Sequence, residues 1–478
     1  MKKNQSYRML TVILSLTVVF ASKTGYAQTF SVLYNFGGVS GDPTFPQKQL
    51  SQGGDGALYG TSNTGGANGS GSIFKLNAAG KVNVVYSFCA QSGCPDGSLP
   101  QAGLTLRPDG HFLGAAAQGG TSNAGTIFDI TESGGFTLLY SFTGGADGAG
   151  PDTPPIIGPD GHFYGVAFVG GGSSCGTAYR LTPAPTGTSA VFTPLHKFAK
   201  AKEGCNPTSL VLGTDGNLYG TNSHGGSAGF GTVFKMTPSG AVTLLHTFSG
   251  LTDGSIPLGL TLGNDGNFYG VAAVPSTGPG GVIFKITPDG IFTVLHTMND
   301  ADGNGPKALF QASDGNFYGA AAEGGTSTNC FFGGTNQGCG TLFEITPAGD
   351  FTVLYNFDLI TGQEPVGGLQ QTSGLLYGNT VDGGTNCCGV LYSLNNGLPP
   401  YAALIPGQAK VGTPVEILGQ GFTSSTSVSF NGMPAATVKV SSPTRLLATV
   451  PSGATTGFVT VTTSSGTLSS IQPFVVAP

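Results

Sequence analysis

Charged residues are scarce in this sequence. Asp, Glu, Lys and Arg make up 9% of its 478 residues, whereas an average soluble domain contains about 25%. This scarcity excludes long charged helices and coiled coils, which depend on flanking charges. Hydrophobic residues still make up 39% and aromatic residues 10%, enough to form a core. The 82 glycines and 30 prolines indicate a chain that turns often.

Positive charge is scarcer still beyond the N-terminal segment. Four of the 18 Lys and Arg residues lie in residues 1–27, and all 24 Asp and Glu residues lie after that segment. The remaining chain is therefore strongly acidic. Because nucleic-acid binding depends on clustered positive charge, we do not expect a nucleic acid as partner.

Long apolar runs are absent except for one short run near the N-terminus. Three positive residues precede the apolar run 9–21, and Gly25 and Ala27 bracket a predicted cleavage point before Gln28. This is the pattern of a signal peptide, and the run is shorter than the roughly 18–20 residues of a membrane span. We therefore expect residues 1–27 to be removed. The mature chain would be exported to the periplasm, the cell surface or the medium, without a membrane span.

The eight cysteines fit an oxidising compartment. We predict three local disulfides, Cys89–Cys94, Cys175–Cys205 and Cys330–Cys339. The first and third pairs each flank a loop, and the second pair lies at the open ends of a predicted hairpin. The adjacent Cys387 and Cys388 either form a strained vicinal bridge or remain thiols, and no redox role is indicated for them.

Three short phrases recur along the chain, each of them seven times. The first has the form Asp-Gly-x-aromatic-Tyr-Gly and lies at 55–60, 109–114, 160–165, 215–220, 265–270, 314–319 and, in degenerate form, 373–378. The second is close to GTVFKI and begins at 71, 125, 176, 231, 281, 340 and 389. The third is close to FTVLYSF and lies at 30–36, 82–88, 136–142, 192–198, 242–248, 292–298 and 351–357.

Each repeat alternates β-branched or aromatic residues with small ones between Asp-Gly turns, which favours short antiparallel strands. In one repeat, for example, we predict strands at 209–212, 218–221, 231–237 and 242–248. Four such strands in about 50 residues indicate a β-propeller blade. We therefore predict an all-β fold with a seven-bladed β-propeller over 28–397. The last repeat lacks a fourth strand, and residues 29–36 would supply it, closing the ring and protecting two sheet edges.

The phrases LYG-T-x-x-GG and GT-x-F-K resemble the GloVer tandem repeats of exported bacterial proteins, which carry varied C-terminal anchors. The resemblance covers about 28–397 and implies a repeat array without indicating an activity. Two copies depart from the pattern, because Leu113 stands at the Tyr position and Ser373 stands at the Asp position.

After Pro399 and Pro400 the composition changes to Val, Thr and Ser with alternating polarity. The segments GTPVEILGQGF (412–422), SVSFNGMPA (427–435) and VPSG (450–453) resemble an IPT/TIG domain, an immunoglobulin-like β-sandwich. Short alternating strands between turns independently favour a sandwich. We predict this domain over 401–478, as a spacer or a binding unit.

Five of the six histidines occupy positions that other residues fill in sister repeats. His111 and His162 replace a turn Asn, whereas His196, His246 and His296 replace a strand Tyr. These five are therefore predicted to be structural. Only His224, in an NSHGG loop, lacks such an explanation and is a candidate general base or metal ligand. No nucleophile motif accompanies it.

The acidic residues mostly recur at turn and loop positions, where we expect their carboxylates to accept backbone N–H bonds. The exception is Asp-Ala-Asp-Gly-Asn-Gly at 300–305, which matches the first half of a calcium loop. Asp300, Asp302 and Asn304 would supply the oxygens, but Gln311 stands where the bidentate Glu is expected. A calcium site and a plain loop both remain open.

Glycine-rich loops after the second strand and the blade-to-blade loops should share one face of the propeller. That face would carry Asn63, Asn222, His224, Glu323 and Asp382. We predict that this face binds a glycan or surface polymer through Asn, Asp and aromatic groups, while the alternative is that the glycines only permit tight packing.

Two function classes follow. The first is a non-catalytic exported or cell-surface binding or scaffold protein, with a polysaccharide or a cell-surface protein as partner. The second is a carbohydrate-active or lyase-type propeller enzyme that uses His224 with Glu323 or Asp382, and it requires a carboxylate about 3 Å from the His224 ring.

Overall fold

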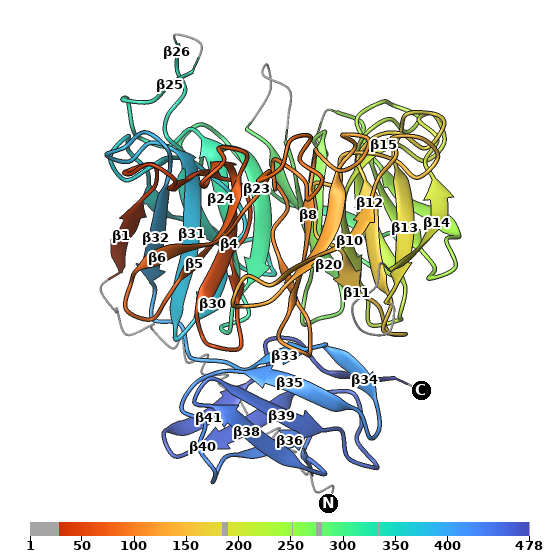
Figure 1. The fold of residues 1–478 in the computed structure, drawn as a ribbon, viewed down its shortest axis with the longest axis vertical. Coiled ribbons are helices and arrows are strands. Elements are labelled where there is room, and N and C mark those ends of the chain that lie inside the picture. Colours follow the sequence, from red (N-terminus) through yellow and green to blue (C-terminus); the bar gives the residue numbers. More distant parts are fainter. Residues whose placement is uncertain (1–27, 184–189, 251, 274–279, 333–334, 478) are drawn as a thin grey trace, which may run out of the picture.

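The computed structural model describes residues 28–183, 190–250, 252–273, 280–332 and 335–477. The predicted signal peptide, residues 1–27, lies outside these residues. Every regular element in the described ranges is a β-strand, which confirms the all-β prediction (Figure 1). None of the described segments is a helix of the length and apolarity that crossing a membrane requires.

Between Thr29 and Asn395, the described residues form seven antiparallel sheets of four or five strands. Sheet 1 contains β2 (Pro43–Pro46), β3 (Ser51–Gln52), β4 (Leu58–Gly65), β5 (Ser72–Leu76) and β6 (Val82–Ser87). Sheet 2 contains β7 (Thr105–Leu106), β8 (Phe112–Ala116), β9 (Thr126–Ile130) and β10 (Phe136–Ser141). Sheet 3 contains β11 (Ile156–Ile157), β12 (Phe163–Ala167), β13 (Thr177–Thr182) and β14 (Val191–Lys197).

The next three sheets follow the same plan. Sheet 4 contains β15 (Cys205–Leu212), β16 (Leu218–His224), β17 (Thr232–Met236) and β18 (Val242–Thr247). Sheet 5 contains β19 (Pro257–Leu262), β20 (Phe268–Ala272), β21 (Val282–Ile286) and β22 (Phe292–Thr297). Sheet 6 contains β23 (Asn304–Gln311), β24 (Phe317–Glu323), β27 (Thr341–Ile345) and β28 (Phe351–Asn356). The strands predicted for residues 209–248 agree with sheet 4, except that β15 begins four residues earlier and β16 ends three residues later.

Sheet 7 combines the two ends of the array. It contains β29 (Gln363–Pro365), β30 (Gln370–Thr372), β31 (Leu375–Asp382), β32 (Val390–Asn395) and β1 (Thr29–Asn35). β1 runs antiparallel to β32, from Thr29 opposite Asn395 to Asn35 opposite Val390. The predicted pairing of the N-terminal strand with the last repeat is thus confirmed. The Phe30 ring also stacks on Tyr355 of sheet 6, with centroids 3.8 Å apart.

The Asp-Gly phrase is explained by a hydrogen bond across the turn. The Asp215 carboxylate accepts the backbone N–H of Asn217 and the hydroxyl of Tyr219, the latter at 2.8 Å. The same Tyr-to-Asp bond forms in four other sheets. Sheet 2, where Leu113 has no hydroxyl, instead pairs Arg107 with Asp109 at 2.7 Å. The Asp and Tyr of this phrase therefore form one capped turn.

The third phrase is tied to the loop that follows it. Tyr86 and Tyr140 donate to Asp96 and Asp147, and the histidines of the sister strands contact acids in the same way. These contacts are His196–Glu203 at 2.8 Å, His246–Asp253 at 3.1 Å and His296–Asp302 at 3.0 Å. The predicted structural role of these three histidines is confirmed, because each ring replaces a Tyr hydroxyl as the partner of the loop acid.

Neighbouring sheets meet at a glycine and a proline. Gly231 opens the second phrase of sheet 4, and a Cβ there would lie 2.5 Å from Pro257 Cδ of sheet 5. Only glycine therefore fits at this contact. The equivalent pairs are Gly71–Pro100, Gly125–Pro151, Gly176–Pro207, Gly281–Pro306, Gly340–Pro365 and Gly389–Pro46. The last pair joins sheet 7 to sheet 1.

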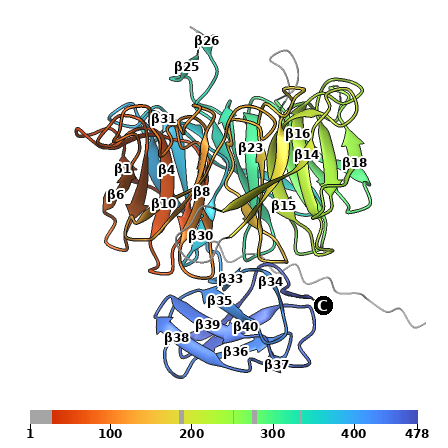
Figure 2. The same ribbon diagram turned by 45° about the vertical axis from the view of Figure 1, so that its right-hand side comes forward.

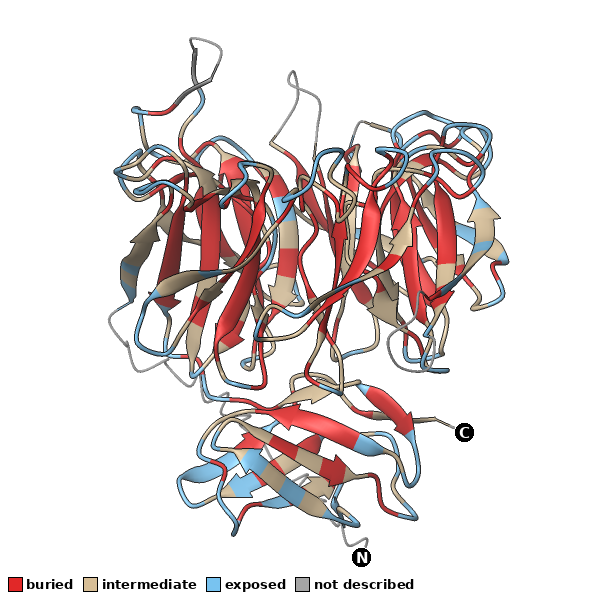
Figure 3. Ribbon diagram, in the orientation of Figure 1, coloured by how far each residue is buried: buried red, intermediate tan, exposed pale blue. Residues whose placement is uncertain are grey.

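Burial follows the position of a strand within its sheet (Figure 3). The middle strands β8, β9, β12 and β20 are buried along their whole length, whereas the outermost strand β18 is half-buried to exposed. The core is thus a series of apolar layers between adjacent sheets, which is how stacked repeats bury surface that no single repeat can bury alone.

The three predicted disulfides are present. Cys175 precedes β13 and Cys205 begins β15, so their bond joins sheets 3 and 4 rather than two ends of one hairpin. Cys330–Cys339 brackets the small hairpin β25 (Phe331–Phe332) and β26 (Thr335–Asn336), which projects from the upper face in Figure 1. Cys387 and Cys388 are thiols, with their sulfurs 3.4 Å apart.

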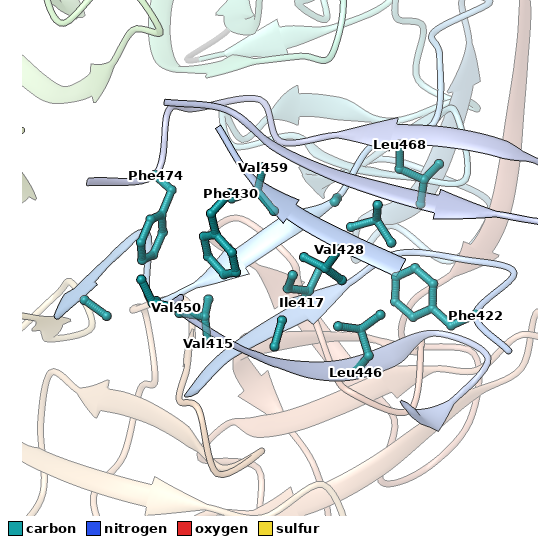
Figure 4. Packing of buried hydrophobic residues seen from close by; sticks show 14 residues of the cluster. Val415, Ile417, Phe422, Val428, Phe430, Leu446, Val450, Val459, Leu468 and Phe474 are labelled. Atoms are coloured by element: carbon teal, nitrogen blue, oxygen red, sulfur yellow. The ribbon is translucent and has the colours of Figure 1, made fainter. Parts of the chain in front are cut away.

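The C-terminal region folds as a β-sandwich, as predicted. One sheet contains β33 (Ala403–Ile405), β35 (Pro414–Leu418), β39 (Arg445–Thr449) and β38 (Val438–Ser442). The facing sheet contains β37 (Met433–Pro434), β36 (Ser427–Phe430), β40 (Val459–Thr463) and β41 (Gly466–Ser469). β34 (Gln408–Lys410) pairs in parallel with β42 (Val475–Ala477). The core between them includes Ile417, Phe430 and Phe474 (Figure 4).

The sandwich lies beneath the seven sheets (Figures 1 and 2). Thr444 donates to the Gly54 carbonyl of sheet 1 at 3.2 Å, and Gln472 donates to the Leu262 carbonyl of sheet 5 at 2.8 Å. Leu418 packs in one apolar cluster with residues of sheets 1 and 2, including Leu104. Contacts with several sheets hold the sandwich against one face of the array.

A buried ion pair lies in this interface. Arg445 Nη2 donates to Glu416 Oε2 at 3.0 Å, and the Glu416 side chain is 0% exposed. Burial, with added repulsion from Glu132 and Asp109 of sheet 2, raises the pKa of Glu416 to about 7 against the opposing effect of Arg445.

We predict that stability falls as pH rises through this range. Because the pKa of Glu416 is raised on folding, the folded state holds its proton more tightly than the unfolded chain. This contribution is present in full below pH 4.5 and is lost as pH rises to about 7. At about 1.4 kcal/mol per pKa unit, the loss is at most about 3.5 kcal/mol. Urea unfolding between pH 4.5 and 8 measures it. A Glu416→Gln variant with the same pH slope would contradict the prediction.

Candidate binding channel

A cavity of about 700 Å³ runs along the inner edges of the sheets. All seven sheets contribute to its wall, each through its first strand or the residues that precede that strand. β15, β19 and β23, the first strands of consecutive sheets, lie side by side there. Its volume falls within the roughly 300–1,000 Å³ that small-molecule sites occupy. We call it the channel.

A proline begins each segment of the channel wall, and the residue before it has an unusual backbone. Pro46, Pro100, Pro151, Pro207, Pro257, Pro306 and Pro365 hold this position. The preceding residues all have φ between 52° and 64°, and they are Phe45, Leu99, Gly150, Asn206, Ile256, Gly305 and Glu364. This left-handed region is disfavoured for residues other than glycine. Packing thus imposes the same sharp turn seven times and brings Ile256 and Glu364 to the channel wall.

Charged side chains are exceptions in this wall. The residues directly after the seven prolines are Gln47, Gln101, Asp152, Thr208, Leu258, Lys307 and Val366. The next residues are Lys48, Ala102, Thr153, Ser209, Gly259, Ala308 and Gly367. Only Asp152, Lys307 and Lys48 carry charge at these positions. Sister sheets adopt the same fold with uncharged residues there, so the repeat does not need these three charges.

Asp152 is half-buried, and one of its oxygens has no partner. Its Oδ1 atom is inaccessible and accepts no hydrogen bond. Burial raises the pKa of Asp152, and the Lys48 ammonium opposes that rise. The hydroxyl of Tyr179, where most sister repeats have Phe, is likewise buried without a partner. Lys48 and Lys307 form no ion pair within the described residues.

Acidic residues also lie near Glu364. Burial raises the pKa of Glu364, Lys307 lowers it, and the charges of Asp382 and Glu323 raise it again. Asp382 ends β31 and Glu323 ends β24, and β24 contacts β29, which contains Glu364. Two of the residues predicted to bind a ligand, Glu323 and Asp382, therefore flank one acid that the sequence did not single out.

The other three predicted residues lie apart from this group. Asn222 is fully buried in β16, and its amide donates to the Glu203 carbonyl at 2.8 Å. Its role is structural, which differs from the ligand contact we predicted. Asn63 Oδ1 accepts a bond from Gln101 Nε2 at 3.4 Å. His224 is exposed at the end of β16 and lines the channel.

His224 has no carboxylate neighbour among the described residues. Its Nδ1 atom is 2.9 Å from Ser223 Oγ, which is the contact the structure gives this ring. The carboxylate about 3 Å away, which the enzyme hypothesis requires, is not found among the described ion pairs and hydrogen bonds.

The predicted calcium residues have separate partners. Asp302 Oδ2 contacts His296 Nε2 at 3.0 Å and accepts from Asn299 Nδ2 at 2.7 Å, the role that its sister acids have. Asn304 Nδ2 donates to Asp300 Oδ1 at 2.8 Å. The described residues contain no group of three or more His, Cys, Asp and Glu side chains arranged to hold a metal ion. The calcium site and the plain loop both stay predictions.

The lower end of the channel adjoins the sandwich. A second cavity of about 370 Å³ lies between the sandwich and the sheets, and Thr261 lines both cavities. Gln472 of the sandwich donates to Gln311 Oε1 at 2.8 Å, and Gln311 in turn accepts the Asn264 N–H. The sandwich thus covers this end, and His224 and Glu364 lie toward the other.

Two known families match parts of the chain. Residues 17–156 match the Gloeobacter/Verrucomicrobia repeat, and residues 403–476 match the IPT/TIG domain. A search of curated proteins finds no match.

Solved structures with similar folds are distant. A fungal alcohol oxidase of the AA5 family in complex with copper is 15% identical, with 91% of this chain and 98% of that chain covered and a TM-score of 0.48. A putative 6-phosphogluconolactonase from Bacteroides uniformis is 16% identical, with 64% and 83% covered and a TM-score of 0.45. Similarity at this level assigns no reaction to the chain. The family matches thus show a Gloeobacter/Verrucomicrobia repeat in residues 17–156 and an IPT/TIG domain in residues 403–476.

Proposed function

We propose that the protein is an exported, non-catalytic binding protein that takes a polar ligand, such as the end of a glycan, into the channel. The observation that carries the proposal is the set of charges in the channel wall. Lys48, Asp152 and Lys307 occupy positions where the other repeats have uncharged residues. The fold of the repeat array does not need these charges, because sister repeats lack them. Unpaired charges around a cavity suit a polar ligand.

The scaffold of this proposal is a seven-bladed propeller closed by β1. Its support is the glycine–proline contact between consecutive sheets, which recurs around the array and ends with Gly389 against Pro46. The three disulfides support export, because such bonds persist in oxidising compartments.

A carbohydrate-active enzyme is the second candidate. The observation in its favour is that burial raises the pKa of both Glu364 and Asp382, as a general acid requires. The isolated ring of His224 removes the base first predicted for this chemistry. Binding without turnover is therefore the better-supported function.

The test is a glycan array screened with the full mature chain. We expect specific binding, and a Lys48→Ala/Asp152→Ala/Lys307→Ala variant should bind the same glycans at least about tenfold more weakly, since each lost charge contact is worth about 1.5–3 kcal/mol. Lys439→Ala, in the sandwich, is the matched control and should bind normally. Equal binding by the triple variant would overturn the channel as the site. Shortened or unsaturated products of a bound glycan, detected by mass spectrometry, would favour the enzyme.

A further inference from the structure

We infer that the channel ligand is a hydroxylated carboxylate, such as a uronic acid at the end of a glycan, held by Lys48 and Lys307 through its carboxylate and by Asp152 through a hydroxyl. This inference rests on the proposed function and names the chemical class of the ligand. It follows from the charges, the unpaired atoms and the shape of the channel.

The two lysines favour an anion. Both are exposed at the channel wall, and neither forms an ion pair with a described residue. Lys48 stands at a position where the other sheets have only Ala, Thr, Ser or Gly, so its long side chain reaches into space that the sister residues leave free. A lysine in such a site attracts a carboxylate as a compact point charge.

Asp152 adds a requirement for a hydrogen-bonding group. Its Oδ1 atom is buried without a partner, and a buried polar atom without a partner costs about 1–3 kcal/mol. Asp152 lines the channel, and a small rotation of its carboxylate would let a ligand hydroxyl donate to this oxygen. Asp152 therefore accounts for the hydroxylated part of the ligand, just as the lysines account for its carboxylate.

Aromatic stacking is nearly absent from the site. Phe168 is the one Phe, Tyr or Trp among the described residues that line the channel, and the whole chain contains no Trp. Our prediction that aromatic groups take part in glycan binding is therefore not supported here. A neutral sugar would lack its usual stacking surface, so charge is the main source of selectivity.

The shape restricts the size of the ligand. Because the sandwich adjoins the lower end through Thr261 and Gln472, a polymer cannot thread through the channel. The site instead accommodates a chain end or a small free molecule. A glycan end and a small free acid would both present a carboxylate and hydroxyls. The experiment below distinguishes between them.

The experiment is isothermal titration of the full mature chain with digalacturonate, its dimethyl ester, and citrate. The ester keeps the hydroxyls and removes the charge. We expect digalacturonate to bind at least about tenfold more tightly than the ester. Lys48→Met and Lys307→Met should each abolish this preference while leaving ester binding unchanged. Tighter binding of citrate would identify a small free acid as the ligand.

The variants have built-in folding controls. Sister sheets fold with uncharged residues at all three positions, so thermal unfolding of Lys48→Met, Lys307→Met and Asp152→Asn should match that of the parent chain. Asp152→Asn should weaken both digalacturonate and the ester. Equal affinities for acid and ester, or binding of neutral glycans that the lysine variants retain, would overturn this inference and leave the proposed function intact. If the chain binds none of the array glycans and also fails to bind digalacturonate, its ester and citrate, this inference and the proposed function are both wrong.

Discussion

Replacing Phe36 by alanine is expected to lower the free energy of unfolding by about 3–5 kcal/mol, the usual cost of deleting a buried phenyl ring. Phe36 is 0% exposed and directly follows β1. Its backbone N–H donates to the Gly389 carbonyl of sheet 7 at 3.0 Å, while its ring packs against Phe74 of sheet 1 with centroids 5.1 Å apart. One side chain thus joins the first and last sheets, and the change opens a cavity where they meet.

Urea unfolding followed by intrinsic tyrosine fluorescence measures this loss. Phe230→Ala is the matched control, because Phe230 is 37% exposed on the same array and its removal should cost no more than about 1 kcal/mol. If Phe36→Ala costs no more than Phe230→Ala, the closure does not depend on this contact.

Removing the Cys175–Cys205 bond should cost about 3–4 kcal/mol. The bond spans 30 residues, and the entropy of closing a loop of that length in the unfolded chain sets the magnitude. Alanine is the suitable replacement at both positions, because Cys175 and Cys205 are buried and an added hydroxyl would be left without a partner. The double variant should also unfold first at the boundary of sheets 3 and 4.

The other cysteines provide the comparison. The Cys89–Cys94 bond spans only 5 residues, so the same relation gives about 2 kcal/mol for its removal. Cys387→Ser/Cys388→Ser removes no bond and should leave stability unchanged. A loss for Cys175→Ala/Cys205→Ala below that for the Cys89 and Cys94 pair would show that sheets 3 and 4 are held together without it.

The repeat made most of the fold predictable. Strand positions and the closing role of β1 followed from comparing sister phrases, because each unit faces the same local constraints of turn and pleat. The three disulfides followed from the positions of the cysteines around loops and strand ends. Leu113 illustrates the limit. The sequence marked it as a departure, but only the structure shows Arg107 paired with Asp109 where the Tyr hydroxyl would have been.

The channel was harder to predict from a comparison of the repeats. The predicted ligand residues belong to glycine-rich loops and the strands before them, whereas the charged wall residues come from the segments after the repeated prolines. Lys48 and Asp152 belong to different sheets, and only the curvature of the array brings them near one another. The sequence nevertheless contained a signal for these wall residues. Each is a charged residue at a position where sister repeats have a small or uncharged one. Asn222 shows the opposite case. The sequence predicted a ligand-binding residue there, whereas the amide is buried within the sheet.

The pairing of β1 with β32 also constrains the order in which the chain can fold. Asn35 and Asn386, which are hydrogen-bonded across this join, are 351 positions apart. β1 is synthesised first, but it cannot pair until β32, near the end of the array, has been synthesised. Contacts within each of the other sheets form earlier. During that interval the chain is an open arc with an unpaired edge at each end, and such edges invite pairing with other chains. The local disulfides, with separations of 5, 9 and 30 residues, can form within this arc before it closes. Closure is thus a single late event on which the protection of both edges depends.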